Sequence, residues 1–236
     1  NLLLMRNFSI IIPVYNEALN IVPLLKLINE YLKNYQKEII VVNDCSTDKP
    51  FHELNNLQKN FLFKIISHQK NLGQSYAIRT GVLNSNFKTI VTIDGDGQND
   101  PKDIEKLVNL YFNYEDIKLV AGIRFNRKDN IVKIVSSKIA NKIRMVILKD
   151  NCPDTGCSLK VFDKEIFLSF PFFNGIHRFL PALFIGYGFK TEYLNVSHNP
   201  RKYGKSKYGT IDRMLRGIRD IFKVKNIIKL KNKHDQ

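Results

Sequence analysis

The feature that most constrains the fold is a regular alternation of short, β-branched apolar runs with amphipathic segments across the first half of the chain. Strands are predicted at residues 8–14, 38–42, 63–67, 88–93 and 118–122, and helices at 19–32, 51–59, 74–83 and 101–112. Strands that alternate with helices at this spacing form a parallel sheet with right-handed crossovers. We therefore expect an α/β fold, a doubly wound and mostly parallel sheet with helices on both faces.

The second half of the chain does not continue this alternation. Residues 131–148 mix Ile and Val with Lys and Arg, residues 172–188 are rich in aromatic side chains, and residues 199–209 form a basic stretch with glycines. A further helix is expected to begin near Thr210. We predict one domain over residues 1–209, divided into 1–124 and 125–209, and then a basic amphipathic helix and tail over 210–236.

Positive charge is concentrated near the C-terminus. The formal net charge of the 236 residues is +15, and the stretch from Pro200 to Gln236 supplies +9 of it, with twelve Lys and Arg against three Asp. This charge predicts an anionic partner, such as a nucleic acid, a phosphorylated small molecule or an acidic membrane surface.

No apolar run approaches the roughly 18 residues that span a bilayer, and residues 1–5 are too few for a signal peptide, so we expect neither a membrane-spanning helix nor a signal peptide. The three cysteines form no CxxC pair, which favours buried thiols in a reducing compartment.

The fourth predicted strand ends in a cluster of carboxylates, in the stretch IDGDGQNDP at residues 93–101. Asp94 and Asp96 are two residues apart in extended chain, so their side chains face the same side, and Gly95 and Gly97 let the backbone bend there. Carboxylates this close repel each other unless they share a cation. Since Mg²⁺ and Mn²⁺ bind through a few carboxylates and substrate phosphates, the stretch predicts half of a metal site whose other half is a diphosphate.

Two alternatives remain for this stretch. Its acids and amides match the ligand positions of an EF-hand loop from Asp94 to Glu105, but Asn99 stands where that loop needs glycine, and a strand precedes it instead of a helix. A purely structural turn, with Asp100 and Pro101 starting the next helix, is the second alternative.

Further polar residues follow the other predicted strands. They are PVYNE at 13–17, Asn43 with Asp44, and NLG at 71–73, which begins a helix of small residues that can pack close to the sheet. Ligands of doubly wound sheets bind outside the carboxyl ends of the strands. A dinucleotide site would need G-x-G-x-x-G after the first strand, where this chain has IPVYNE, so that site is excluded. Asp44 can accept hydrogen bonds from a nucleobase or ribose, or cap its own loop together with Ser46.

Seven motifs together resemble a known family. They are IIIPVYNEALNI (10–21), VVNDCSTDK (41–49), NLGQSYAIRTG (71–81), IDGDGQNDP (93–101), AGIR (121–124), DTGCSLKVF (154–162) and RKYGKSKYG (201–209). In this order, over nearly the whole chain, they resemble the family-two inverting glycosyltransferases of the GT-A fold. Within that family the chain is most similar to the dolichol-phosphate mannosyltransferase and polyprenyl-phosphate glycosyltransferase group.

The resemblance implies a nucleotide-sugar donor, a lipid-phosphate acceptor and Mg²⁺ or Mn²⁺. The residues implied for the donor are Pro13, Tyr15, Glu17, Asp44, Gly73 and Asp94, with Arg201, Lys205 and Lys207 at its diphosphate. The residues implied for the metal are Asp94, Asp96 and Gln98, and those implied for the acceptor phosphate are Arg124, Lys133 and Ser137. Of these, Asp96, Arg124 and Arg201 are the expected catalytic residues. The first half of the domain would then hold the nucleotide sugar, and the second half the acceptor.

Three features depart from the family pattern. Lys133 stands where the family usually has Arg, and Ser158 stands where it often has Phe. Many members also carry membrane helices after the catalytic domain, and none is predicted within this sequence.

A phosphate acceptor makes a simple mechanism sufficient. The second pKa of a phosphate monoester is about 6, so at neutral pH it is an anionic nucleophile that needs no general base. It needs positive charge for placement, and the departing nucleoside diphosphate needs neutralisation by a metal and by the basic stretch. Gly204 and Gly209 favour a mobile lid there. A single displacement inverts the anomeric carbon of GDP-mannose or a UDP-hexose.

Other functions stay open from the sequence. Transfer to a sugar hydroxyl in cell-surface polysaccharide assembly would need a base, for which Asp154 is the candidate. A basic nucleic-acid-binding module is a remote alternative, since basic and aromatic residues are not interleaved and the acids would repel phosphate. A catalytically inactive nucleotide-sugar binder is a further one.

The last predicted helix suggests attachment to a membrane. One helical face collects apolar side chains, namely Ile211, Met214, Leu215, Ile218, Ile221 and Phe222. Basic residues flank this face, so we expect peripheral binding to the anionic, cytoplasmic face of the cell membrane, directly or through a small membrane protein. The alternative is that the apolar face packs on the catalytic domain and only the last dozen residues are free. Both hold if the helix covers the core and its basic face meets lipid.

Overall fold

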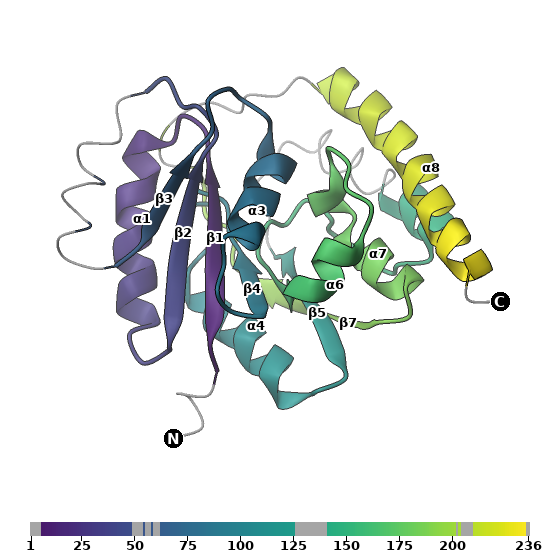
Figure 1. The fold of residues 1–236 in the computed structure, drawn as a ribbon, viewed down its shortest axis with the longest axis horizontal. Coiled ribbons are helices and arrows are strands. Elements are labelled where there is room, and N and C mark those ends of the chain that lie inside the picture. Colours follow the sequence, from purple (N-terminus) through teal and green to yellow (C-terminus); the bar gives the residue numbers. More distant parts are fainter. Residues whose placement is uncertain are drawn as a thin grey trace.

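The structure is a computed structural model that describes residues 6–48, 54, 58, 62–125, 141–201, 203 and 210–234. Its described part contains a seven-stranded sheet of order β3-β2-β1-β4-β6-β5-β7 (Figure 1). The strands are β1 (Phe8–Val14), β2 (Lys37–Asn43), β3 (Lys64–Ser67), β4 (Thr89–Thr92), β5 (Ile117–Arg124), β6 (Lys160–Asp163) and β7 (Lys190–Val196). The helices are α1 (Ala18–Tyr31), α3 (Gln74–Leu83), α4 (Lys102–Asn113), α6 (Lys164–Ser169), the 3₁₀ helix η2 (Ile176–Arg178), α7 (Leu180–Gly186) and α8 (Thr210–His234). A further helical stretch covers residues 141–148.

The predicted α/β fold is confirmed. The five predicted strands and the helices α1, α3 and α4 lie within two residues of their predicted bounds. The helix predicted at 51–59 falls almost entirely outside the described residues. The sheet is mostly parallel, but β6 lies antiparallel between β4 and β5. The alternation did not predict β6, since it has only four residues and begins with a lysine.

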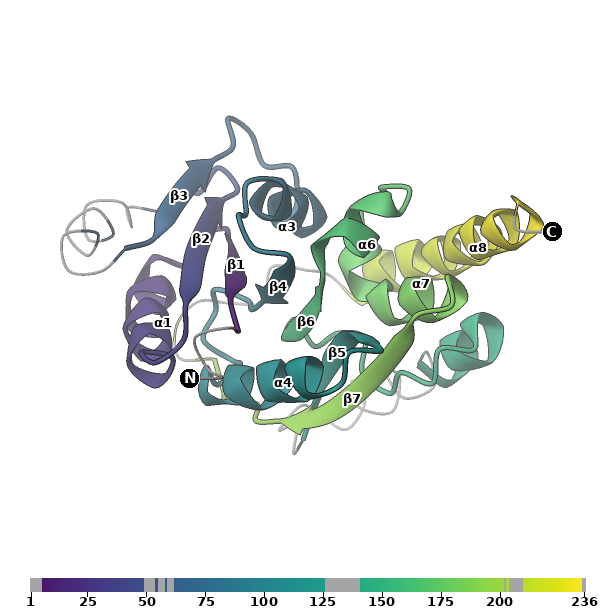
Figure 2. The same ribbon diagram turned by 60° about the horizontal axis from the view of Figure 1, so that its bottom comes forward.

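Helices cover both faces of the sheet, and Figure 2 shows the two layers. Alternate residues of a strand point to opposite faces. Ile10 and Ile12 of β1 therefore pack in one core with α1 and α4, whereas Ile11 packs in the other with α3, α6 and α7. This arrangement leaves the loops at the carboxyl ends of the strands to form the site.

Helix α8 packs against α7 through part of its apolar surface. Ile221 and Val224 are buried, and a Cβ on Gly186 would lie 2.5 Å from Ile228. Ile218 and Phe222, by contrast, are exposed. The single apolar face that we predicted is thus divided between the protein core and the surface, and the side chains of residues 210–216 lie outside the description. Among the described residues, no helix combines the length and apolarity needed to cross a bilayer.

The close approach of α3 to the sheet yields a stability prediction. A Cβ on Gly81 would lie 2.4 Å from Ile11 Cγ2 and 3.3 Å from Val42 Cγ2. Gly81→Ala should therefore lower the free energy of unfolding by about 1–3 kcal/mol through overpacking, despite the better helix propensity of alanine. Urea denaturation measures this change.

The matched control is Gly217→Ala, which places the same methyl group on α8 where no atom lies within 4 Å. That variant should gain about 0.5–1 kcal/mol, because Gly is unfavourable inside a helix. Equal stabilisation by both substitutions would contradict the close packing of α3 on the sheet.

Candidate active site

The sheet brings the sequence-predicted polar segments together at one edge. Parallel pairing aligns Val14 with Asn43, and the amide of Asp44 donates to the Val14 carbonyl oxygen at 2.8 Å. Parallel pairing of β1 with β4 places Asp94, two residues beyond Thr92, at the same edge. The segments at 13–17, 43–44 and 94–98 therefore line a common site.

Asp94 and Asp96 form the electrostatic centre of this site. Burial and the charge of Asp96 raise the pKa of Asp94 to about 7, although a hydrogen bond with Ser158 and the positive charges of Lys160 and Arg124 oppose the shift. The Asp94 carboxylate also accepts a hydrogen bond from Gln74 Nε2 at 2.6 Å. Two carboxylates in this state resist being ionised together.

The donor set fits a hard divalent cation. No group of three or more His, Cys, Asp or Glu side chains suited to a metal occurs in the described part of the chain. Mg²⁺ needs only one or two carboxylates when substrate phosphates and water complete its shell. Asp94 and Asp96 therefore suit a metal that arrives with a phosphate ligand, and a cation would relieve their repulsion.

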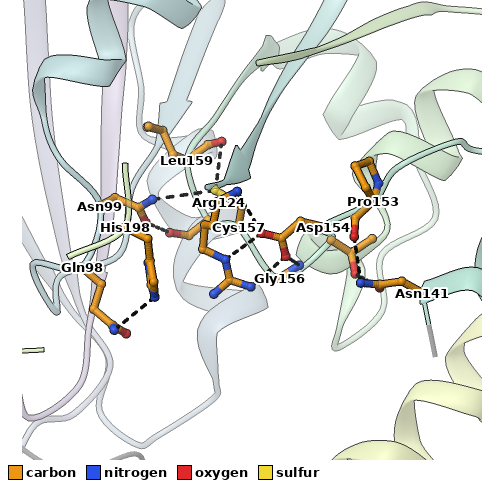
Figure 3. A network of polar contacts seen from close by, with 12 residues as sticks. Gln98, Asn99, Arg124, Asn141, Pro153, Asp154, Gly156, Cys157, Leu159 and His198 are labelled. Atoms are coloured by element: carbon orange, nitrogen blue, oxygen red, sulfur yellow. Dashed lines mark hydrogen bonds and ion pairs between the residues drawn. The ribbon is translucent and has the colours of Figure 1, made fainter. Parts of the chain in front are cut away.

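Gln98, the third predicted ligand, contacts the segment that follows β7. Its side-chain Nε2 lies 3.5 Å from His198 Nε2 (Figure 3). It also lies 3.4 Å from the Asn199 carbonyl oxygen. Its backbone amide donates to Asp96 Oδ1 at 3.1 Å. Gln98 thus adjoins the two carboxylates, and its role as a metal ligand stays a prediction.

Arg201 reaches the same place from the segment after β7. It forms an ion pair with Glu17, and its Nη2 lies 3.8 Å from Asp96 Oδ2. Asn20 supports this arrangement, since its Nδ2 donates to Glu17 Oε2 at 2.8 Å and to the Tyr203 carbonyl oxygen at 3.3 Å. The fold therefore unites two residues predicted for the donor. The predicted Lys133, Ser137, Lys205 and Lys207, and the glycines of the predicted lid, lie outside the described residues.

Asp44 is buried and shapes the turn that precedes α3. Its carboxylate accepts hydrogen bonds from the amides of Leu72 at 2.9 Å and Gly73 at 2.7 Å. His68 Nδ1 lies 2.7 Å away and must donate its hydrogen, because an ionised carboxylate only accepts. Gly73 has φ +95°, so the turn requires glycine there. A nucleobase contact would have to use the remaining lone pairs of Asp44.

Arg124 and Asp154 form a tight, oriented pair (Figure 3). Asp154 accepts from Arg124 Nε and Nη2, both at 2.7 Å, and from the Arg124 amide at 3.1 Å. Burial opposes the charge of Arg124, but the hydrogen bonds and charge of Asp154 outweigh it and raise the pKa of Arg124. A Cβ on Gly156 would lie 2.7 Å from Arg124 Nη2, so glycine leaves room for the pair. Bidentate pairing fixes the plane of the guanidinium.

Sequence reasoning missed three residues of the site. Gln74 and Ser158 contact Asp94, and the ammonium of Lys160, which is buried in β6, donates to the Cys157 carbonyl oxygen. Ser158 also donates to Asn99 Oδ1 at 2.9 Å and so ties the loop after β4 to the loop before β6. The signals for all three lie within the motifs NLGQSYAIRTG and DTGCSLKVF, but their pairing depends on the tertiary fold.

Comparison with known proteins identifies the family. The family model described as "Glycosyl transferase family 2" matches residues 9–169. The chain therefore belongs to glycosyl transferase family 2.

Curated relatives are longer than this chain. The dodecaprenyl-phosphate galacturonate synthase of Rhizobium johnstonii is 32% identical over 223 residues, which are 92% of this chain and 65% of the relative. The undecaprenyl-phosphate 4-deoxy-4-formamido-L-arabinose transferase of Proteus mirabilis is 31% identical over 205 residues, 85% of this chain and 62% of the relative. The chain thus spans less than two thirds of the length of either protein.

A solved structure shares the fold. Glucosyl-3-phosphoglycerate synthase from Mycobacterium tuberculosis, in complex with Mn²⁺, UDP and glucosyl-3-phosphoglycerate, superposes with a TM-score of 0.69 at 17% identity. The match covers 93% of this chain and 78% of that one. The GT-A architecture expected from the resemblance is confirmed.

Proposed function

We propose that the chain transfers a sugar from a nucleotide-sugar donor to the phosphate of a polyprenyl-type lipid, with inversion at the anomeric carbon. Family membership supports glycosyl transfer. The names of two relatives, a dodecaprenyl-phosphate galacturonate synthase and an undecaprenyl-phosphate 4-deoxy-4-formamido-L-arabinose transferase, support the lipid-phosphate acceptor.

We choose a phosphate acceptor because Asp154 is already hydrogen-bonded to Arg124. A hydroxyl acceptor needs a general base, and Asp154 was the candidate. This carboxylate instead accepts three hydrogen bonds from Arg124. A phosphate monoester is already anionic at neutral pH and needs a cation rather than a base. An oriented arginine suits such an acceptor, and in this mechanism Asp154 only orients Arg124.

On the donor side, some residues would bind the metal ion, and Arg201 would neutralise the charge of the diphosphate. Asp94 and Asp96, with Gln98, would hold a Mg²⁺ or Mn²⁺ ion, which supplies positive charge to the departing diphosphate when bound. Similar folds solved with Mn²⁺ or with Mg²⁺ and UDP support this assignment. Arg201 exchanges its pairing with Glu17 for the donor diphosphate and adds a second positive charge.

The nucleotide would lie along the ends of β1 and β2. Pro13, Tyr15 and Glu17 border it on one side, and Asp44 with Gly73 on the other. The donor is GDP-mannose or a UDP-hexose. The relatives' names include both galacturonate and a formamido-arabinose, so this fold accommodates different sugars in different proteins.

The enzyme would meet its lipid substrate at the cytoplasmic face of the membrane. Ile218, Phe222 and Leu230 expose apolar surface on α8, and the same helix carries five lysines after residue 222. A basic amphipathic helix binds an anionic interface by burying such side chains and by attraction of its charges. A small membrane protein could serve as an additional anchor.

The metal role predicts a loss of activity in Asp96→Asn. This variant should reduce sugar transfer to polyprenyl phosphate by about 10²–10³-fold, because charge stabilisation of the leaving diphosphate is lost. Transfer is measured in detergent with Mn²⁺ and radiolabelled donor. The control, Asp100→Asn, keeps the hydrogen bond to the Lys102 amide and should stay near wild-type activity. Full activity of the wild type after chelation would refute the metal role.

The assignment of a phosphate acceptor predicts which of two substitutions, at Asp154 or at Arg124, lowers the transfer rate more. Asp154→Asn retains one oxygen acceptor for Arg124, so it should impair transfer to polyprenyl phosphate less than Arg124→Ala, which removes a charge-assisted contact and should cost roughly 10–100-fold. Steady-state rates over a range of acceptor concentrations test this order. Efficient transfer to an uncharged sugar that Asp154→Asn abolishes would instead favour the hydroxyl acceptor.

If α8 binds the membrane, its exposed apolar side chains should contribute to the affinity for anionic vesicles. The double variant Phe222→Ser, Leu230→Ser should bind anionic vesicles at least about tenfold more weakly, because two apolar groups no longer enter the interface. Flotation of the full chain with anionic and neutral liposomes measures binding. The control is Leu62→Ser, whose side chain is 93% exposed ahead of β3. Equal flotation of the double variant and wild type would exclude this face of α8.

A further inference from the structure

The first turn of α3 is tied to a segment a hundred residues away. Ser75 is fully buried, and its Oγ lies 2.6 Å from His177 Nδ1. The same oxygen accepts a hydrogen bond from the Gly175 amide at 2.7 Å. A buried hydroxyl with two partners on one segment fixes the position of both elements. The segment at residues 174–178, which includes η2, therefore holds α3 at its N-terminal end.

This end of α3 is part of the donor site. Gln74, the neighbour of Ser75, donates to Asp94 Oδ1 at 2.6 Å. A Cβ on Gly73 would contact the Asn174 side chain at 3.6 Å. A shift of the first turn would therefore move Gln74 away from Asp94 and change the turn that Asp44 binds.

The same segment is held from its other side by α8. Arg178 Nη2 lies 2.7 Å from Asp220 Oδ2. Gly175 has φ +113°, and a Cβ there would lie 2.8 Å from Asp220 Oδ2, so the carboxylate packs directly on the backbone. Lys223 Nζ, one turn further, lies 5.2 Å from the centre of the Phe173 ring. Because Val224 and Ile228 pack α8 firmly on the domain, Asp220 is a fixed support rather than a loose surface charge.

We propose that Asp220 of α8 is a positioning residue for the donor site. Asp220 fixes the 174–178 segment through its contacts with Arg178 and Gly175. This segment in turn fixes Ser75 in the first turn of α3. That turn keeps the Gln74 side chain hydrogen-bonded to Asp94. Helix α8 is then part of the catalytic unit and not only a tail. The proposal rests on the proposed function in taking Asp94 as part of the donor–metal site.

The linkage has a consequence for membrane binding. Coupling between two sites is reciprocal, so a surface that stabilises α8 in this position also favours donor binding, and the bound donor favours that surface to the same degree.

The first test needs no ligand. Amide hydrogen exchange of the full, unliganded chain is compared for wild type, Asp220→Ala and the control Asp116→Ala, which breaks the remote ion pair of Asp116 with Lys190. The reporters are Gly175, whose amide donates to Ser75 Oγ, and Ala77, whose amide donates to the Gly73 carbonyl oxygen at 3.1 Å. Asp220→Ala should accelerate exchange at both by roughly tenfold, the effect of losing one charged hydrogen bond. Exchange equal to that of the control would overturn the proposal.

The second test measures nucleotide binding with Mn²⁺, using UDP and GDP in calorimetry. Asp220→Ala and Ser75→Ala should each weaken binding by roughly 3–10-fold, and the double variant should be no weaker than the worse single one, because both substitutions break the same chain of contacts. Ser85→Ala, which removes a buried hydroxyl bonded to the Val82 carbonyl oxygen at the far end of α3, should bind as wild type. Faster exchange with unchanged affinity would overturn the link to the donor site.

The wild-type binding data and one further variant distinguish failure of this proposal from failure of the proposed function. If wild type binds neither nucleotide, the proposed function fails, while the exchange experiment still decides whether Asp220 positions α3. Asp220→Asn, which keeps an acceptor oxygen, serves if the alanine variant unfolds, and it should show a smaller effect in the same direction. A full return to wild-type exchange and affinity in Asp220→Asn would overturn a role for the ion pair.

Discussion

The burial of the Asp94 carboxylate beside a second carboxylate, Asp96, is the constraint on which the rest of the site depends. Burial and the neighbouring charge of Asp96 raise the pKa of Asp94 to about 7, so ionising both carboxylates together costs free energy. The fold opposes this with charges and donors from segments far apart in sequence. They are Gln74 on α3, Arg124 on β5, Ser158 and Lys160 at the start of β6, and Arg201 after β7. Each reduces the electrostatic cost, and a divalent cation would complete the compensation.

The antiparallel strand β6 explains how this compensation is assembled. Because β6 runs against β4, its first residue, Lys160, pairs with the last residue of β4, Thr92. The loop before β6 therefore enters at the carboxyl edge, and it brings Asp154 to Arg124 at the end of β5 and Ser158 to the amide of Asp94. A parallel strand would have placed that loop at the opposite edge of the sheet.

Local patterns predicted the parallel half of the fold and the carboxylate pair, since both depend on residues close together in sequence. Helix α3 was predicted with its observed bounds, Gln74–Leu83. Strand β6 was not predicted, because it has only four residues and begins with a lysine, which is buried. Arg124 and Asp154 were both singled out as functional, but their mutual pairing depends on strand order, which no local pattern contains. The division of the α8 surface was missed for the same reason, since the elements that α8 packs against decide which of its apolar residues are covered.

The position of α8 bears on the reaction proposed above, between a nucleotide-sugar donor and a lipid-phosphate acceptor. The apolar residues that α8 buries on α7 are separate from those it exposes, so one helix can pack on the domain and face a lipid surface at the same time. Asp220 lies among the residues that face the domain, next to Gly175. In the proposed membrane-bound state, a displacement of α8 would therefore act on a helix whose inner side touches the segment beside α3. Packed helices shift as units rather than deform, so under the proposed linkage a shift of α8 would reach Gln74 through the 174–178 segment and Ser75.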